Sequence, residues 1–239
     1  MEIKTIKTKI FKLSENLEDF MEHYLSSLKE GSILVVTSKI VALAEGRVAD
    51  GTNPLIKKKI IEAESDFVLP TKHVYLTIKD GMVMANAGVD ESNADGKIIL
   101  LPRDSFKVAA RLREYFRTKN KLNNLGVIIT DSRCLPLRAG ITGVALGYAG
   151  FRGLKDYRGE RDIFKRPFKF SRVNVVDSLA AAAVVCMGEG NERLPLAIIA
   201  QAPVVFSNKV DKRELKINIQ DDMYGPIFKF SGRTKGWRG

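Results

Sequence analysis

Residues 73–93 read HVYLTIKDGMVMANAGVDESN, and this stretch decides the fold class. Two apolar runs, His73–Ile78 and Met82–Ala85, flank Asp80 and Gly81, a dipeptide that favours the tight turn of an antiparallel hairpin. Elsewhere, expected strands and helices are interspersed, a pattern that parallel sheets share. The hairpin argues against a purely parallel sheet. We therefore predict an α+β fold with mixed, largely antiparallel sheets and packed helices.

The remaining elements follow from hydrophobic periodicity and from capping residues. Ser14 and Asp177 are the expected N-caps of the first and last helices, and the glycine-rich segment Gly140–Gly153 predicts closely packed backbone. Strands are expected at 6–10, 33–36, 126–130, 168–176 and 196–200, and helices at 14–31, 40–44, 54–64, 104–120 and 178–187.

The composition is that of a folded chain with a sizeable core. It has 239 residues, of which 45% are hydrophobic. No apolar run reaches the length of a membrane span, and the start, MEIKTIKTKI, lacks the apolar region of a secretory signal. Cys134 and Cys186 indicate a reducing compartment without a disulfide framework. We expect a cytoplasmic protein with one domain, 1–239, whose residues 202–239 form a tail that associates with a dimer partner.

The net charge of +11, from 39 basic and 28 acidic residues, favours anionic partners. Nucleotides, phosphorylated or carboxylated metabolites and RNA all fit, whereas solubility alone also explains dispersed lysines. The run Lys57–Lys59 is interpreted as a solvated helix face, and His73 as structural or exposed. With His23 as the other histidine, neither a His-based zinc site nor a Ser/His/Asp triad is plausible. The sequence therefore points away from acyl-enzyme hydrolysis and toward metal-assisted phosphoryl chemistry.

Two polar segments follow apolar runs and carry the candidate metal ligands. One is NAGVDESN at 86–93, and the other is Thr130–Ser132, expected as a loop after a strand. Asp90 and Asp131 are carboxylates of the kind that hold Mg²⁺ or Mn²⁺ together with substrate phosphates, and Ser132 offers a hydroxyl to a second ion. Alternatively, both aspartates cap turns. We expect the two segments to meet.

Two further stretches can contact anions. Met187–Asn191, which reads MGEGN, exposes backbone N–H groups that can approach a phosphate, although a helix commonly ends in glycine. No Walker or GxGxxG motif occurs, so a nucleotide site must be of another type. The segment 156–162, DYRGERD, offers arginines for carboxylate or phosphate, or else forms an exposed ion-paired turn.

Five stretches, in this order and spacing, resemble the coenzyme F-420-0:L-glutamate ligase family, the gamma-glutamyl ligases of the deazaflavin coenzyme. They are SILVVTSKIVALAEGRV (32–48), NAGVDESN (86–93), GVIITDSRCLPLRAGITGVALGYAG (126–150), DYRGERD (156–162) and VVDSLAAAAVVCMGEG (175–190). The resemblance covers residues 4 to 201.

This resemblance implies an acid–amino-acid ligase with the family's α+β fold, assembled as an intertwined homodimer. GTP, with ATP as an alternative, phosphorylates the acceptor's terminal carboxylate, and the amine of L-glutamate then displaces phosphate to form a gamma-linked amide. Two divalent ions, Mg²⁺ or Mn²⁺, are implied, with K⁺ as a further candidate. Transfer of a phosphoryl group needs charge neutralisation more than a protein nucleophile, which agrees with the residues present. We expect neither a membrane nor a nucleic-acid partner.

Several residue roles are carried over by motif. Asp90 and Asp131 would bind the first metal, with Ser132 and either Glu189 or the backbone of Gly190 near the second. The nucleotide contacts implied are Ser38, Lys39, Asn93, Gly188, Glu189, Gly190, Asn191 and, in a poorly matching N-terminal segment, Ile10 and Phe11. From charge and not from a motif, Arg138, Arg158 and Arg161 are candidates for the acceptor carboxylate or phosphate, Arg138 with a catalytic role.

Departures from the family pattern lie at the nucleotide and substrate edges. Leu43 stands where a nucleotide-contacting lysine is usual, TKIF replaces an apolar-proline motif, Ser178 replaces an acidic residue, and Phe164-Lys165-Arg166 lacks a customary glycine. The metal-binding stretches are intact. The acceptor is therefore the deazaflavin precursor or a similar anion, with folate as an alternative. A nucleotide- or RNA-binding homologue without catalysis is the rival from another class. The sequence leaves open the number of glutamates added.

Overall fold

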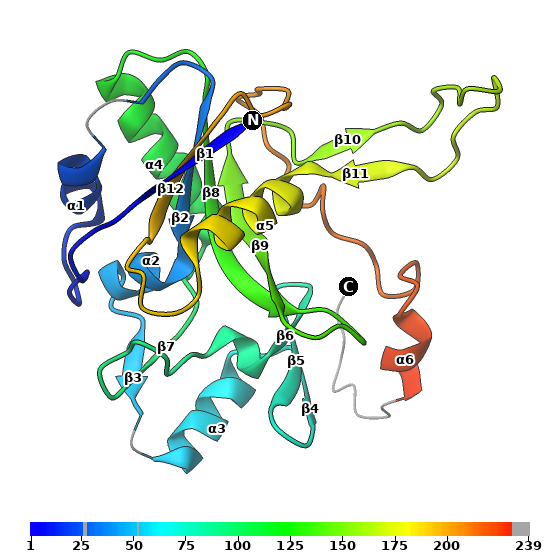
Figure 1. Ribbon diagram of the computed structural model, residues 1–239. Helices are drawn as coiled ribbons and strands as arrows, with labels where there is room; N and C mark the ends of the chain where they lie inside the picture. Colours follow the sequence, from blue (N-terminus) through cyan, green and yellow to red (C-terminus); the bar gives the residue numbers. More distant parts are fainter. Residues whose placement is uncertain (26–27, 52, 231–239) are drawn as a thin grey trace.

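A five-stranded sheet forms the centre of the computed structural model, which describes residues 1–25, 28–51 and 53–230 (Figure 1). β2 and β8 run parallel, whereas the other three pairings are antiparallel, so the predicted mixed sheet is confirmed. The strands lie in the order β1 (Glu2–Ile6), β12 (Leu196–Ala200), β2 (Ser32–Thr37), β8 (Leu125–Cys134) and β9 (Ile141–Ala149).

Helices cover both faces of this sheet because alternate side chains of β2 and β8 point to opposite faces. Leu34 and Val36 pack with α1 (Leu17–Tyr24), α2 (Ser38–Ala44) and α4 (Ser105–Lys119), whereas Ile33 and Val35 pack with α5 (Val175–Met187). All four of these strand residues are fully buried. Hydrophobic burial on two faces therefore fixes the register of the strands.

Glycines on β9 let two helices approach the sheet closely, as the glycine-rich segment predicts. A Cβ at Gly143 would lie 2.6 Å from the carbonyl oxygen of Ala180 on α5. A Cβ at Gly147 would lie 2.4 Å from the backbone of Ser105 at the start of α4. A larger residue at either position would push a helix away.

A smaller layer lies beside the main sheet and carries the hairpin (Figure 1). The hairpin strands β5 (Tyr75–Lys79) and β6 (Met82–Ala85) pair around Asp80 and Gly81, as predicted. A short 3₁₀ turn, η1 (Asn86–Gly88), then leads into the segment that contains Asp90. The other elements of this layer are β3 (Val48–Asp50), α3 (Pro54–Ala63), β4 (Phe67–Pro70) and β7 (Lys97–Ile99).

Two elements lie apart from these layers. A long hairpin, formed by β10 (Leu154–Asp156) and β11 (Arg172–Asn174), projects from the body, and α6 (Gly225–Phe230) follows an irregular segment (Figure 1). The final GRTKGWRG, at 232–239, lies outside the described residues. Within the described part of the chain, none of the helices has the length and apolar content that crossing a membrane requires.

Several predicted boundaries are wrong. Asn16 caps the first helix by accepting a hydrogen bond from the N–H of Asp19, because Ser14 has a left-handed φ of 60°, and the helix ends at Tyr24 instead of Gly31. The first strand stops at Ile6.

The strand expected at 168–176 shrinks to β11, because Asn174 already caps α5 three residues before Asp177. The Asp177 carboxylate instead accepts a hydrogen bond from the backbone N–H of Ala145 at 2.8 Å. The residue expected as a cap therefore joins α5 to β9.

The expected loop at Thr130–Ser132 is also wrong. These residues continue β8, which pairs with β9 as far as Cys134 after an irregularity between Ile129 and Thr130. β9 supplies partners for the backbone beyond the point where pairing with β2 stops at Thr37 and Thr130. Asp131 therefore sits on a rigid strand.

Candidate active site

The parallel pair β2–β8 brings the first two groups of site residues together. Parallel strands end at the same edge of a sheet, so Ser38, directly after β2, lies opposite Asp131 on β8. The Ser38 hydroxyl donates a hydrogen bond to Oδ1 of Asp131 at 3.3 Å. The sheet edge therefore fixes the first carboxylate of the site.

Lys39, the next residue, connects this edge to the segment 86–93. Its Nζ lies 2.7 Å from Oδ2 of Asp90 and also donates to the carbonyl oxygen of Ser92 at 2.7 Å. Asp90 in turn accepts hydrogen bonds from the N–H and the hydroxyl of Ser92, both at 2.7 Å. The two polar segments thus meet through the Ser38–Lys39 pair, as predicted.

The glycine-rich turn after α5 forms the third side of the site. The Asn93 amide donates to the carbonyl oxygen of Gly190 at 3.0 Å, and the Ser132 hydroxyl donates to the Glu189 carboxylate. The N-terminal segment lies alongside, because the N–H of Thr8 donates to the carbonyl oxygen of Arg193 at 3.0 Å. Segments from five regions of the sequence therefore converge at one place.

The two carboxylates have different electrostatic surroundings. Burial raises the pKa of Asp131, and the charge of Arg133, the N–H of Ser132 and the hydroxyl of Ser38 offset only part of this effect. Burial acts in the same direction on Asp90, but hydrogen bonds from Lys39 and Ser92 outweigh it and hold the pKa of Asp90 below its ordinary value. Asp131 is therefore a half-buried carboxylate whose charge is incompletely compensated, which favours a nearby cation.

The donor set fits a hard divalent ion. Asp90, Asp131, Ser132 and Glu189 all present oxygen atoms, the ligands that Mg²⁺ and Mn²⁺ prefer. Among the described residues, there is no group of three or more His, Cys, Asp or Glu side chains that would enclose a metal by itself. Such ions commonly bind one or two protein carboxylates and complete their shell with substrate phosphates and water.

Other predicted site residues lie farther from this centre. Arg138 is exposed in the turn between β8 and β9. Arg158 and Arg161 are on the projecting hairpin, where Arg158 pairs with its neighbour Asp156 at 2.6 Å (Figure 1). In the N-terminal segment, Ile10 is 71% exposed, whereas Phe11 is buried. The Phe11 ring packs edge-on against Phe20, so nucleotide contact in this segment would come from Ile10 or the backbone.

Leu43, which stands where the family usually has a lysine, is half-buried on α2 and packs against two hydrophobic clusters, one of them around Ile99. Ile99 forms the β-bridge to Asp90. Leu43 therefore lies in the layer that supports the carboxylate site.

Sequence reasoning missed Arg133, two residues beyond Asp131. Its side chain is buried and donates from Nη1 to the carbonyl oxygen of Val83 at 3.0 Å. Within the described part of the chain, its Nε and Nη2 atoms are buried without a hydrogen-bond partner. Burial lowers the pKa of Arg133, and the charges of Asp131, Asp177 and Asp80 act in the opposite direction. If Thr130–Ser132 is interpreted as a strand, Asp131 and Arg133 lie on the same face, because side chains two positions apart point the same way. That interpretation would have indicated that Arg133 lies close to the site carboxylate.

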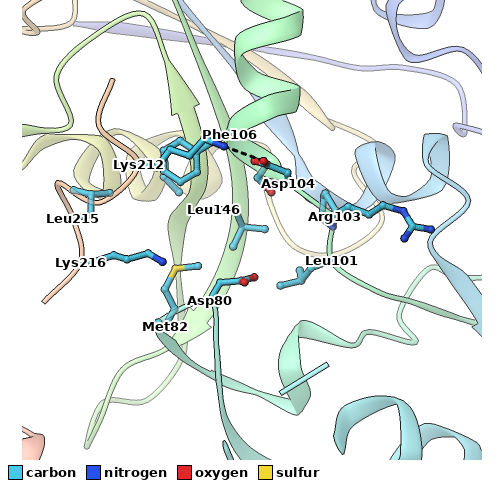
Figure 2. Close-up of a pocket in the computed structure, with 14 residues that line it drawn as sticks. Asp80, Met82, Leu101, Arg103, Asp104, Phe106, Leu146, Lys212, Leu215 and Lys216 are labelled. Carbon is cyan, nitrogen blue, oxygen red and sulfur yellow. Dashed lines mark hydrogen bonds and ion pairs between the residues drawn. The ribbon is translucent and has the colours of Figure 1, made fainter. Parts of the chain in front are cut away.

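A cavity of about 310 Å³ lies between the turn of the β5–β6 hairpin, the start of α4 and β9 (Figure 2). Leu101, Phe106 and Leu146 form apolar parts of its wall, and Lys212, paired with Asp104 at 2.9 Å, closes one side. Leu101 lies two residues beyond Ile99, the β-bridge partner of Asp90. At about 3.3 Å per residue, the cavity is therefore a short distance along the chain from the carboxylates.

Comparison with known proteins gives a consistent result. Residues 5–201 match the family described as F420-0:Gamma-glutamyl ligase. The coenzyme F420:L-glutamate ligase of Methanocaldococcus jannaschii is 33% identical over 228 residues, which cover 87% of this chain and 90% of that protein. Proteins of the same name from Methanococcus maripaludis strain C7 and Methanopyrus kandleri are 35% and 36% identical, covering 81% and 72% of this chain and 85% and 76% of their own lengths.

Proposed function

Because the chain belongs to the F420-0:gamma-glutamyl ligase family, we propose that it joins L-glutamate to the terminal carboxylate of coenzyme F420-0 or a similarly tailed anion, using a nucleoside triphosphate. The observation that carries this proposal is the convergence of Asp90, Asp131 and the glycine-rich turn at the edge where the pairing of β2 with β8 stops. This edge combines oxygen ligands, a lysine and backbone N–H groups, which phosphoryl transfer requires.

The proposed reaction has two steps. An oxygen of the acceptor carboxylate attacks the γ-phosphorus of GTP, the bond to the β–γ bridging oxygen breaks, and GDP leaves. The amine nitrogen of L-glutamate then attacks the carbonyl carbon of the acyl phosphate, the C–O bond to phosphate breaks, and the amine loses a proton to solvent. The products are the gamma-linked amide and inorganic phosphate.

The residues of the edge would divide the work of this reaction. Asp90, Asp131 and Ser132 would hold divalent ions, with Glu189 or the backbone of Gly190 near the second. Such ions, when bound, neutralise phosphate charge and orient the oxygens that attack and leave. Lys39 pairs with Asp90 at 2.7 Å, and its ammonium would contact a phosphate oxygen of the nucleotide. The N–H groups of the turn 188–191 would contact the nucleotide.

The cavity in Figure 2 is the proposed place for the ring of the acceptor. Its apolar wall formed by Leu101, Phe106 and Leu146 suits an aromatic system. Leu101 follows the Ile99–Asp90 bridge by two residues, so the acceptor's tail would extend from the cavity toward Asp90. Folate, which also has an aromatic ring and a glutamate tail, is the alternative acceptor to be compared directly.

We further propose that the active form is a homodimer in which the projecting hairpin contacts the partner. Large apolar side chains near its tip are open to solvent: Ile163 is 91% exposed, Phe164 74% and Phe170 86%. Exposed apolar groups of this size on a projecting arm are typical of a protein interface. The same arm carries Arg158 and Arg161, so their predicted substrate contacts would be made in the partner's site.

The test measures inorganic phosphate released from GTP and from ATP. Mg²⁺ or Mn²⁺, L-glutamate, and a deazaflavin or folate acceptor are each omitted in turn, and mass spectrometry identifies the product. Release that requires the metal, glutamate and one acceptor supports the ligase and names its acceptor and nucleotide. No release with any acceptor, together with RNA binding that weakens steeply with salt, would instead support the non-catalytic binding protein.

A further inference from the structure

A second cavity, of about 360 Å³, lies between α3 and the turn that joins β4 to β5. Basic side chains come from both walls: Lys57 and Lys58 from the helix, and Lys72 and His73 from the turn. Thr71, Tyr75 and Asn86 complete its polar lining, and no aspartate or glutamate in the described part of the chain lines it. We call this the basic cavity.

The basic cavity changes the meaning of two features of the sequence. The run Lys57–Lys59 and His73 are 14 or more positions apart in the sequence, and each alone has an ordinary explanation as a solvated or exposed group. The fold brings Lys57, Lys58 and His73 to one cavity and leaves Lys59 outside it. Positively charged lysines repel one another, so gathering Lys57, Lys58 and Lys72 in one hollow favours an anion that lies between them.

Two contacts place the basic cavity beside the segment that holds Asp90. Asn86, the first residue of that segment, lines the cavity and accepts a hydrogen bond from the N–H of Tyr75 at 2.9 Å. Lys57 pairs with Glu91, the neighbour of Asp90, at 2.8 Å. Within the described residues, the side chains of Lys72 and His73 have no hydrogen bond or ion pair, so they are available to a ligand.

We propose that the basic cavity binds a ligand that carries several anionic groups in a row. Its volume exceeds by about an order of magnitude the ~30 Å³ that one water molecule occupies, which leaves room for more than one such group. Resting on the proposed function, the source is a gamma-linked glutamate tail, which carries a carboxylate at every residue and no ammonium group. Free L-glutamate fits less well because its ammonium is repelled by the lysines. The polyphosphate of a nucleotide is the other source with this chemistry.

Calorimetric titration of the full chain tests this proposal without nucleotide or metal. The probes are an N-acetylated tri-γ-glutamate peptide and inorganic triphosphate. The variant K58Q/K72Q/H73Q removes two lysine charges and the His73 imidazole from the cavity but keeps Lys57 and its pair with Glu91. K59Q is the matched control because Lys59 lies on the same helix outside the cavity. Thermal melting checks that each variant is folded.

We expect the triple variant to bind the peptide about tenfold more weakly than the parent, because each exposed charge contact or hydrogen bond contributes a small factor and three donor side chains are removed together. K59Q should stay within about twofold, and added salt should weaken binding to the parent because it screens exposed charges. Equal affinity of the parent and the triple variant, or no binding of either probe to the parent, would overturn the proposal.

The two probes separate the two sources. Binding of triphosphate that depends on the three residues, without binding of the peptide, keeps an anion site but overturns the glutamate tail as its ligand. These titrations involve no turnover. If the chain ligates nothing but the peptide still binds through Lys58, Lys72 and His73, the proposed reaction fails and the basic cavity stands.

Discussion

Replacing Asp131 with asparagine keeps the size of the side chain and its hydrogen bond with Ser38, but it removes the negative charge. Mutating a residue that only hydrogen-bonds to a metal ligand typically lowers metal affinity or activity by about 10- to 100-fold. Loss of a direct ligand should therefore lower turnover by at least about a hundredfold. A hundredfold loss of turnover corresponds to about 2.7 kcal/mol of transition-state stabilisation.

The stability of the same variant should move in the opposite direction. Burial raises the pKa of Asp131, so the folded chain holds that proton more tightly than the unfolded chain does. Ionisation of this group therefore lowers the free energy of unfolding as pH rises above the ordinary carboxyl pKa. Asp131→Asn avoids this cost. Its Tm at neutral pH should equal or exceed that of the parent, and the difference should vanish near about pH 3, where both states are protonated.

The assay combines three measurements: glutamate-dependent phosphate release, Mn²⁺ binding in the presence of nucleotide, and thermal melting at both pH values. Asp66→Asn is the control, because Asp66 is an exposed aspartate away from this edge and should change none of them. A variant that keeps its activity but melts several degrees lower would refute the reasoning. In that outcome Asp131 is a structural carboxylate, since about 1 kcal/mol shifts Tm by roughly 2–4 °C in a domain of this size.

Three further substitutions test the fold and the nucleotide edge. Gly143→Ala should destabilise the chain by about 1–3 kcal/mol in denaturant unfolding, because its Cβ would lie 2.6 Å from the backbone of α5; an unchanged midpoint would contradict that close approach. Glu64→Gln should cost about 1–2 kcal/mol at neutral pH, since Glu64 pairs with Arg47 and Lys79, each at 2.8 Å. Burial opposes ionisation of Glu64, but these two partners outweigh it and hold the pKa of Glu64 low. The loss of stability in Glu64→Gln should therefore disappear as pH falls through that pKa. A loss of stability that persists in acid would argue against the pairing. Leu43→Lys should lower the nucleotide Kd if position 43 reaches the nucleotide, and an unchanged Kd measured by calorimetry would place it outside contact distance.

Local signals in the sequence were sufficient for the hairpin, for the close packing of the glycine-rich segment Gly140–Gly153, and for the central strands β2, β8 and β12. Asp80 and Gly81 adopt positive φ angles of 53° and 77°, which is the backbone conformation that makes this dipeptide a turn signal. The β2 run and the strand before Thr130 are apolar because both faces are covered, and such runs can be read directly.

Tertiary context decided what local signals could not. Thr130–Ser132 is polar and reads as a loop, but pairing with β9 makes it a strand. Ser14 and Asp177 are good capping residues by type, yet Asn16 and Asn174 occupy the cap positions. The same context explains why the basic cavity was missed: Lys57–Lys59 is a solvated face until the β4–β5 turn is placed against it.

The parallel pairing of β2 with β8 also has a consequence for folding kinetics. Ser38 and Asp131 are 93 positions apart, so their contact requires closure of a long loop, which is slow and occurs late relative to local structure. In a chain where only hairpins and helices have formed, Asp131 does not yet lie beside Ser38 and Lys39, so the ligand site is not yet assembled. A ligand that binds this edge selects the completed fold and shifts the unfolding equilibrium toward it by mass action.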